Sequence, residues 1–176
     1  MYPLFRMKLR RLVPSIPSEG LALMHYLAIH DFVWINTVVT GVQVPYDPVA
    51  LEQAMAAQYA YGTSTDPLRQ AAYLLKTMLR KPPFAEGNLA TTFLVVATFL
   101  AANGYDLAIT GREAADLMVQ CARGEVKPSD AIQRMAVQRG GGLQPGDTLR
   151  TLVARLCHEH SEVLEVLAQT EERIAA

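Results

Sequence analysis

Hydrophobic residues recur along most of the chain at intervals of three and four positions, and prolines, glycines and aspartates separate the repeating segments. This spacing places the apolar side chains on one face of a helix, so the pattern predicts a series of amphipathic helices. They are expected at about 18–40, 47–61, 66–80, 88–103, 110–124, 128–138 and 148–174. No segment alternates long enough to require a sheet, so the expected fold class is all-α, with at most a short flap hairpin near 42–46.

The helix expected at about 88–103 differs from the others because it is apolar on every side. The segment 89–102 contains no charged residue and spans only 14 positions. A membrane-spanning helix needs about 20 apolar residues, so this segment is predicted to be a core helix and no membrane association is expected. A helix that is hydrophobic all round must be enclosed by other elements. The expected architecture is therefore a helical bundle around a buried central helix.

Proline and capping residues mark where several of these helices begin and end. Asp47-Pro48 and Asp66-Pro67 are start signals, because the aspartate side chain accepts hydrogen bonds from the first backbone amides and proline suits the first helical position. Lys81-Pro82-Pro83 ends the third helix, since proline disfavours helical geometry in the residue before it.

Changes in composition divide the chain into four parts. Residues 1–17 form a basic N-terminal arm, 18–138 a helical domain, 139–147 a linker rich in Gly and Pro, and 148–176 a C-terminal amphipathic helix. Apolar positions in the last part follow steps of four and three, which suits packing against another helix. The sequence leaves open whether this face binds a second copy of the chain or docks on the chain's own domain.

Composition and charge exclude several classes of protein. Of the 176 residues, 51% are hydrophobic and 19% are charged, which excludes a disordered chain. A formal net charge of −1 argues against nucleic acid as a partner, although the basic arm keeps a nucleic-acid-associated protein as the lowest-ranked alternative. Two cysteines are too few for a disulfide scaffold and no secretory signal is evident, so a cytoplasmic location is expected.

The segment 82–91 is the best candidate for chemistry, because it leads directly into the central helix. The first turn of a helix leaves backbone N–H groups unpaired and carries partial positive charge, which suits an anion. Gly87 would let a ligand approach the backbone closely. Glu86 is a candidate ligand for a Mg²⁺ ion that also binds phosphate oxygens. Simple helix capping by Gly87-Asn88 is the alternative interpretation.

The same stretch resembles the signature of the Fic and Doc (death-on-curing) families, H-P-F-x-[DE]-G-N-x-R-T. The matching residues are Pro83, Phe84, Glu86, Gly87, Asn88 and Thr91. Flanking segments are also similar: 99–107 to the family's F-L-x-x-N-G-Y ending, 28–31 to an I-H-D element and 51–54 to an L-E-S-A helix. The resemblance covers about residues 18–138 and implies a Fic/Doc-like bundle with an extra C-terminal helix.

Two motif positions depart from the family. Its histidine, the general base that activates a hydroxyl of the target protein, falls on Pro82, and its arginine, which steadies the nucleotide phosphates, falls on Ala90. Losing a general base costs about 10²–10⁴ in rate. Losing a phosphate-binding cation costs about 10²–10³, by analogy with a lost oxyanion donor. The resemblance therefore implies a pseudoenzyme with no catalytic residue in place, unless a base has relocated and Arg80 or Lys81 supplies the missing charge.

The leading hypothesis is a catalytically impaired Fic/Doc-like protein that acts by binding. Its ligand would be a protein partner, reached through the flap at 42–46 and the C-terminal helix, or a second copy bound through that helix. A nucleotide such as ATP is the other expected ligand, held with Mg²⁺ on Glu86 by the loop residues Phe84, Glu86, Gly87, Asn88 and Thr91. An active transferase of AMP or phosphoryl groups to protein hydroxyls is the first alternative.

Two further features of the family bear on this chain. An intact Doc site would imply a toxin with a neighbouring antitoxin, and the substitutions at Pro82 and Ala90 put that role in doubt. Some Fic proteins carry an inhibitory C-terminal helix with the pattern [ST]-x-x-x-E-[GN]. Ser161 and Glu165 match its first half, and Val166 departs from the rest.

Overall fold

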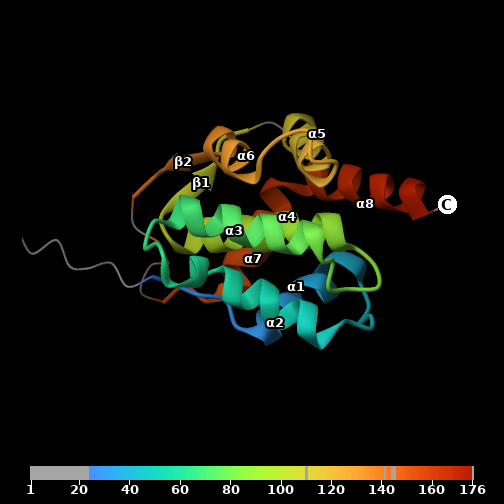
Figure 1. The fold of residues 1–176 in the computed structure, drawn as a ribbon, viewed down its shortest axis with the longest axis horizontal. Coiled ribbons are helices and arrows are strands. Elements are labelled where there is room, and N and C mark those ends of the chain that lie inside the picture. Colours follow the sequence, from blue (N-terminus) through green and yellow to red (C-terminus); the bar gives the residue numbers. More distant parts are fainter. Residues whose placement is uncertain (1–23, 110, 141, 144–145, 176) are drawn as a thin grey trace, which may run out of the picture.

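The computed structural model describes residues 24–109, 111–140, 142–143 and 146–175. The expected basic arm at 1–17, and Thr110 at the start of the expected 110–124 helix, lie outside the described residues. Within them the chain is mostly helical with one small sheet, which confirms the all-α class (Figure 1). The elements are α1 (Ile29–Thr40), α2 (Pro48–Ala57), η1 (Ala60–Gly62), α3 (Pro67–Arg80), α4 (Asn88–Ala102), β1 (Tyr105–Leu107), α5 (Gly111–Ala122), α6 (Pro128–Met135), β2 (Ala136–Gln138), α7 (Leu149–Glu159) and α8 (Ser161–Ala175).

Helix α4 forms the centre of the bundle, as predicted. Every residue of 90–100 is buried, and so is Ala102. Helices α1, α3, α7 and α8 pack against it, with α3 in front of it and α7 behind it in Figure 1. Burying a side chain as large as Phe93 or Phe99 contributes about 1.5–3 kcal/mol, so this enclosure is a main source of stability. The start of α4, with the candidate loop, is consequently held by several helices at once.

The membrane prediction concerns this same helix. Helix α4 has 15 residues, fewer than the roughly 20 that a bilayer requires. In the part of the chain that the structure describes, no helix combines the length and the hydropathy of a membrane span.

Helices α2 and α3 begin where the sequence predicts. Asp47 Oδ1 accepts hydrogen bonds from the backbone N–H groups of Val49 (2.8 Å) and Ala50 (3.2 Å). Asp66 Oδ1 accepts one from Leu68 N at 3.0 Å. Each aspartate is followed by a proline at the first helical position. The caps therefore satisfy amides that a helix leaves unpaired at its start.

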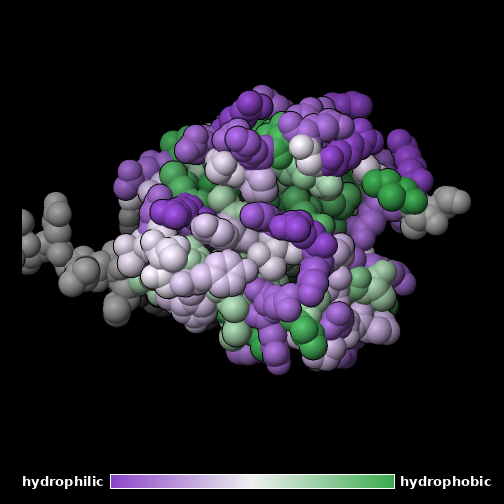
Figure 2. Space-filling model, viewed as in Figure 1, coloured by the Kyte–Doolittle hydropathy of each residue, from purple (hydrophilic) through white to green (hydrophobic). Residues whose placement is uncertain are grey.

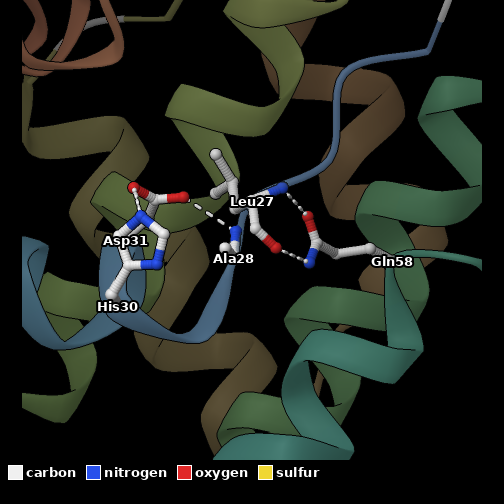
Figure 3. A network of polar contacts seen from close by, with 5 residues as sticks. All are labelled: Leu27, Ala28, His30, Asp31 and Gln58. Atoms are coloured by element: carbon white, nitrogen blue, oxygen red, sulfur yellow. Dashed lines mark hydrogen bonds and ion pairs between the residues drawn. The ribbon is translucent and has the colours of Figure 1, made fainter.

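Helix α1 begins at Ile29 and not near residue 18, because a distant glutamine binds the backbone before it. Leu27 N donates to Gln58 Oε1 at 2.8 Å, and Gln58 Nε2 donates to Leu27 O at 2.9 Å. Figure 3 shows these two bonds beside the start of the helix, where Ala28 N donates to Asp31 Oδ2 at 2.7 Å. Since both polar backbone groups of Leu27 already have a partner, residues 24–28 stay outside the helix.

The flap hairpin expected near 42–46 is not present. That segment instead forms one isolated antiparallel bridge, between Tyr46 and Phe84. Among the described residues the only sheet is the antiparallel pair β1 and β2, in which Asp106 lies opposite Val137. Residues 136–138 therefore leave the expected 128–138 helix to pair with the strand that follows α4.

The C-terminal segment forms two helices and not the single long helix expected at 148–174. The break falls at His160, whose backbone has φ −116° and ψ 25°. Both helices pack on α4, and α8 also packs on α5. The apolar positions that bring them there are buried: Leu152, Val153, Leu156, Val163 and Leu167. The sequence left open whether this face binds a second copy or the chain's own domain, and in the structure it packs on the chain's own domain.

Candidate anion-binding loop at the start of the central helix

The loop before α4 is braced by an asparagine of its own motif. Phe84 N donates to Asn88 Oδ1 at 2.9 Å, and Asn88 Nδ2 donates to Phe84 O at 2.7 Å. This pair of bonds closes 84–88 into a compact turn and holds the Phe84 ring in the core, where it is 5% exposed. The side chain of Asn88 is thus used within the turn, and its backbone N–H is left for another acceptor.

The segment expected as a flap lies directly against this loop. Asp47 N donates to Pro83 O at 2.7 Å, and Ala85 N donates to Pro45 O at 2.9 Å. These two bonds flank the bridge between Tyr46 and Phe84, whose rings lie 6.3 Å apart in an edge-on arrangement. The segment before α2 and the loop before α4 are therefore joined along their backbones.

Two features require glycine at position 87: the left-handed backbone conformation and the close approach of α1. It is the N-cap residue of α4 and has left-handed geometry, with φ 72° and ψ 22°, which residues other than glycine adopt only at a cost. A Cβ atom at this position would lie 2.7 Å from Thr40 Cγ2 of α1. The space beside Gly87 is therefore filled by α1, and glycine allows the approach of a neighbouring helix.

Thr91 and the backbone of Glu86 are tied to α1 by one buried side chain. Asn36 Nδ2 donates to Thr91 Oγ1 and to Glu86 O, both at 3.0 Å. Asn36 is 1% exposed and Thr91 is fully buried. The Thr91 hydroxyl therefore positions the loop from inside, while the side chain of Glu86 is exposed.

The start of α4 does bind an anion, and that anion is a carboxylate of the same chain. Glu171 Oε1 accepts a hydrogen bond from Asn88 N at 2.9 Å, and Glu171 Oε2 accepts one from Leu89 N at 2.9 Å. Asn88 Nδ2 also approaches Oε1 at 3.4 Å. These amides belong to the first turn, where the helix supplies no acceptor and the helix dipole favours negative charge. Glu171 of α8 thus takes the position that the sequence suggested for a phosphate.

Among the described residues, no histidine forms a hydrogen bond, ion pair or ring contact with 82–91. His25 N donates to Asn103, at the opposite end of α4. The side chain of His30 is 84% exposed and pairs with its neighbour on α1. His160 packs against the middle of α4, where burial lowers its pKa.

Ala90 stands at the position where the motif has arginine, and the nearest cations in the sequence before the loop are Arg80 and Lys81. Ala90 is fully buried, so this position faces the core. Lys81 Nζ donates to Gln53 Oε1 of α2 at 3.1 Å. Arg80 and Lys81 line a groove on the outer side of α3. Neither cation forms a hydrogen bond or ion pair with 84–91 in the described structure.

While Glu171 caps α4, the backbone N–H groups of Asn88 and Leu89 are not available to a nucleotide phosphate. Mg²⁺ is usually held by one or two carboxylates together with phosphate oxygens and water, and Glu86 is the one carboxylate of the motif. The position of the phosphate is filled by Glu171, whose charge repels a second anion. Over the described ranges, no three His, Cys, Asp or Glu side chains gather closely enough to hold a metal ion.

Comparisons with protein-family models, with curated proteins and with solved structures find no match to this chain. The resemblance to Fic and Doc proteins therefore rests on the motif residues and their spacing.

Two residues of the site were not found from the sequence. Glu171 is one of several charged residues on an amphipathic helix, and its contact with Asn88 joins positions 83 apart. The inhibitory pattern pointed to Glu165, which is exposed. Asn36 is a polar residue in the middle of an apolar helix. A buried amide needs hydrogen-bond partners, so this position was the one signal in the sequence that Asn36 has a structural role.

Proposed function

We propose that this chain is a catalytically impaired Fic/Doc-like protein that acts by binding a protein partner, with its anion-binding loop closed by its own C-terminal helix. The observation that carries the proposal is the contact of the Glu171 carboxylate with the backbone N–H groups of Asn88 and Leu89. A phosphate would need the same donors. Pro82 offers no proton acceptor, so a nucleotide that displaced Glu171 would still lack a base there.

The partner surface that we propose is the segment 38–49, beside the closed loop. Four large apolar side chains are exposed there: Val38 (40%), Val42 (59%), Tyr46 (40%) and Val49 (58%). In the lower part of Figure 2, where Figure 1 places α1 and α2, separate hydrophobic side chains are exposed among hydrophilic ones. Exposed apolar groups that gather in one region are typical of interaction sites. The apolar face of α7 and α8 is buried within the chain, so a partner or a second copy is expected at 38–49.

A first experiment measures the melting temperature with and without ATP and Mg²⁺. A ligand that binds the native state raises the melting temperature, so the closed loop predicts no rise for the wild type. Glu171→Ala frees the two amides, so ATP with Mg²⁺ is expected to raise its melting temperature. Glu172→Ala, at an exposed neighbouring position, should behave as the wild type. A rise in the wild type as large as in Glu171→Ala would contradict a closed loop.

Nucleotide binding is the second candidate function, and the anion-binding geometry at the start of α4 favours it. It requires Glu171 to leave, after which the exposed Glu86 is free to hold Mg²⁺. If Glu171→Ala shows no rise either, the nucleotide candidate is wrong and protein binding remains. Transfer of label from radioactive ATP to a protein by the wild type, lost in Glu86→Ala, would instead establish the active transferase.

A second experiment tests the partner surface. Val42→Asp places a charge in the segment 38–49, and Val137→Asp places one at a similarly exposed valine on β2 (59% and 51% exposed). Proteins retained from a cell extract by the wild type should be lost with Val42→Asp and kept with Val137→Asp. Equal retention by both variants would show that the partner binds elsewhere.

A further inference from the structure

The exposed face of α3 carries a row of cations and an aromatic ring. Arg69, Tyr73, Lys76 and Arg80 are spaced four, three and four residues apart, which places them along one side of the helix. The three cations are exposed and Tyr73 is half-buried. No acidic residue occurs in 67–85. This face is therefore positively charged although the chain as a whole has a net charge of −1.

Two neighbouring grooves run along this face and share Tyr73 and Lys76. The larger has a volume of about 640 Å³ and lies between α3 and the start of α6, where Lys127 and Pro128 complete its wall. The smaller has a volume of about 340 Å³ and adds the side chains of Tyr61, Arg80 and Lys81. Figure 2 shows strongly hydrophilic side chains along the front of the molecule, where Figure 1 places α3. We call the two together the α3 groove.

The five cations of the α3 groove have no ion-pair partner in the part of the chain that the structure describes. They are Arg69, Lys76, Arg80, Lys81 and Lys127. Among the described residues that line it, Asp66 is the one carboxylate, and its side chain caps α3. A groove lined by one sign of charge attracts ligands of the opposite sign.

Beside these cations, Tyr61 has an exposed ring and an unusual backbone conformation. Tyr61 is 66% exposed and has left-handed geometry with φ 54° and ψ 34°, next to Ala60 with φ 43°. Two consecutive non-glycine residues in this region are strained, and such strain concentrates at functional sites. Tyr73 meets the Tyr61 ring edge-on at 5.9 Å. The structure thus presents an open ring surface in a cationic groove.

We propose that the α3 groove binds single-stranded nucleic acid. Cationic grooves that follow the backbone, with aromatic side chains on which bases stack, are how such strands are held without sequence preference. The distance from Arg69 to Arg80 is about 16 Å at 1.5 Å per residue, so the cations extend over a polymer and not a single phosphate. An acidic peptide would use the cations but would give the Tyr61 ring no base to stack on. The proposal does not depend on the loop or on Glu171.

The test is fluorescence anisotropy of the full chain with labelled oligo-dT and oligo-U of 12 nucleotides. Five phosphate contacts predict that log K falls against log salt with a slope of about −3.5, since each contact contributes about 0.7 for a single strand. Lys76→Glu with Arg80→Glu removes two contacts and is expected to reduce this slope by about 1.4. The matched control is Arg112→Glu with Arg155→Glu, which changes the net charge equally at residues that line neither groove. Equal binding by both double variants overturns the proposal. That result is expected if the basic arm alone binds the oligonucleotide.

Two substitutions of Tyr61 test the stacking. Tyr61→Gly removes the ring and suits the left-handed backbone, so the melting temperature should not fall while affinity drops about 5- to 150-fold. Tyr61→Phe keeps the ring and should keep the affinity. Unchanged binding by Tyr61→Gly, or competition by poly-glutamate as strong as by unlabelled oligonucleotide, would show that the groove recognises acidic polymers in general and would overturn the assignment to nucleic acid.

Discussion

Replacing Glu171 by alanine removes the acceptor for two first-turn amides of α4, and the structure allows the loss of stability to be bounded. A capping side chain at a helix start contributes about 0.5–2 kcal/mol, and a hydrogen bond to a charged group contributes about 1.5–3 kcal/mol. Both hydrogen bonds to Glu171 are 2.9 Å long and only partly buried. In the variant, water can bind the freed N–H groups and offset part of the loss. We expect a loss of about 1–3 kcal/mol, or about 2–12 °C in melting temperature for a chain of this size.

Thermal and urea unfolding at neutral pH measure this loss, and two variants serve as comparisons. Glu171→Gln keeps the shape of the side chain without its charge, so its loss should be smaller than that of alanine. Glu172→Ala removes an exposed carboxylate from the next position and should change stability by less than about 0.5 kcal/mol. If Glu171→Ala is no less stable than Glu172→Ala, the carboxylate does not cap α4 and the reasoning about a closed loop fails.

Three further predictions concern the supports of the loop and of α4. Gly87→Ala should be more destabilising than Gly41→Ala in urea unfolding, because both incur the left-handed penalty of about 1–2 kcal/mol but only the first places a Cβ against Thr40; equal losses would refute the contact with α1. Asn36→Ala leaves the Thr91 hydroxyl and the Glu86 carbonyl without their donor and should cost about 1–3 kcal/mol in the same assay; an unchanged midpoint would contradict this. Burial lowers the pKa of His160 below its ordinary 6.5, so the unfolded chain binds a proton more readily than the folded chain and stability falls as pH decreases below that value. His160→Phe should therefore lose less melting temperature than the wild type between pH 7.5 and pH 5.5, and an equal loss would count against it.

The helix starts that the sequence predicted correctly depend on residues next to one another. Asp47 and Asp66 each cap a helix through amides two or three residues away, so the signal and the structure lie in the same short segment. The enclosure of α4 was likewise predictable, because a helix that is apolar all round has no stable place at the surface.

The features that the sequence did not predict depend on contacts between distant segments. The late start of α1 follows from Gln58, 31 positions from Leu27, and the closed loop follows from Glu171, 83 positions from Asn88. Nothing in the spacing of a glutamine or a glutamate says which distant backbone groups it will meet. The break at His160 was hidden for a related reason, because α7 and α8 share one heptad-like pattern across it.

The backbone bonds between 45–47 and 83–85 give the molecule a mechanical connection. Asp47 caps α2 with its side chain and donates its backbone N–H to Pro83 O, so one residue holds both the start of α2 and the loop that leads into α4. Val49 lies two residues after Asp47 and donates its backbone N–H to the Asp47 side chain, so a molecule bound at Val49 would sit beside the residue that also holds the loop before α4. The proposed partner surface at 38–49 and the loop that Glu171 caps therefore share Asp47 as a common support.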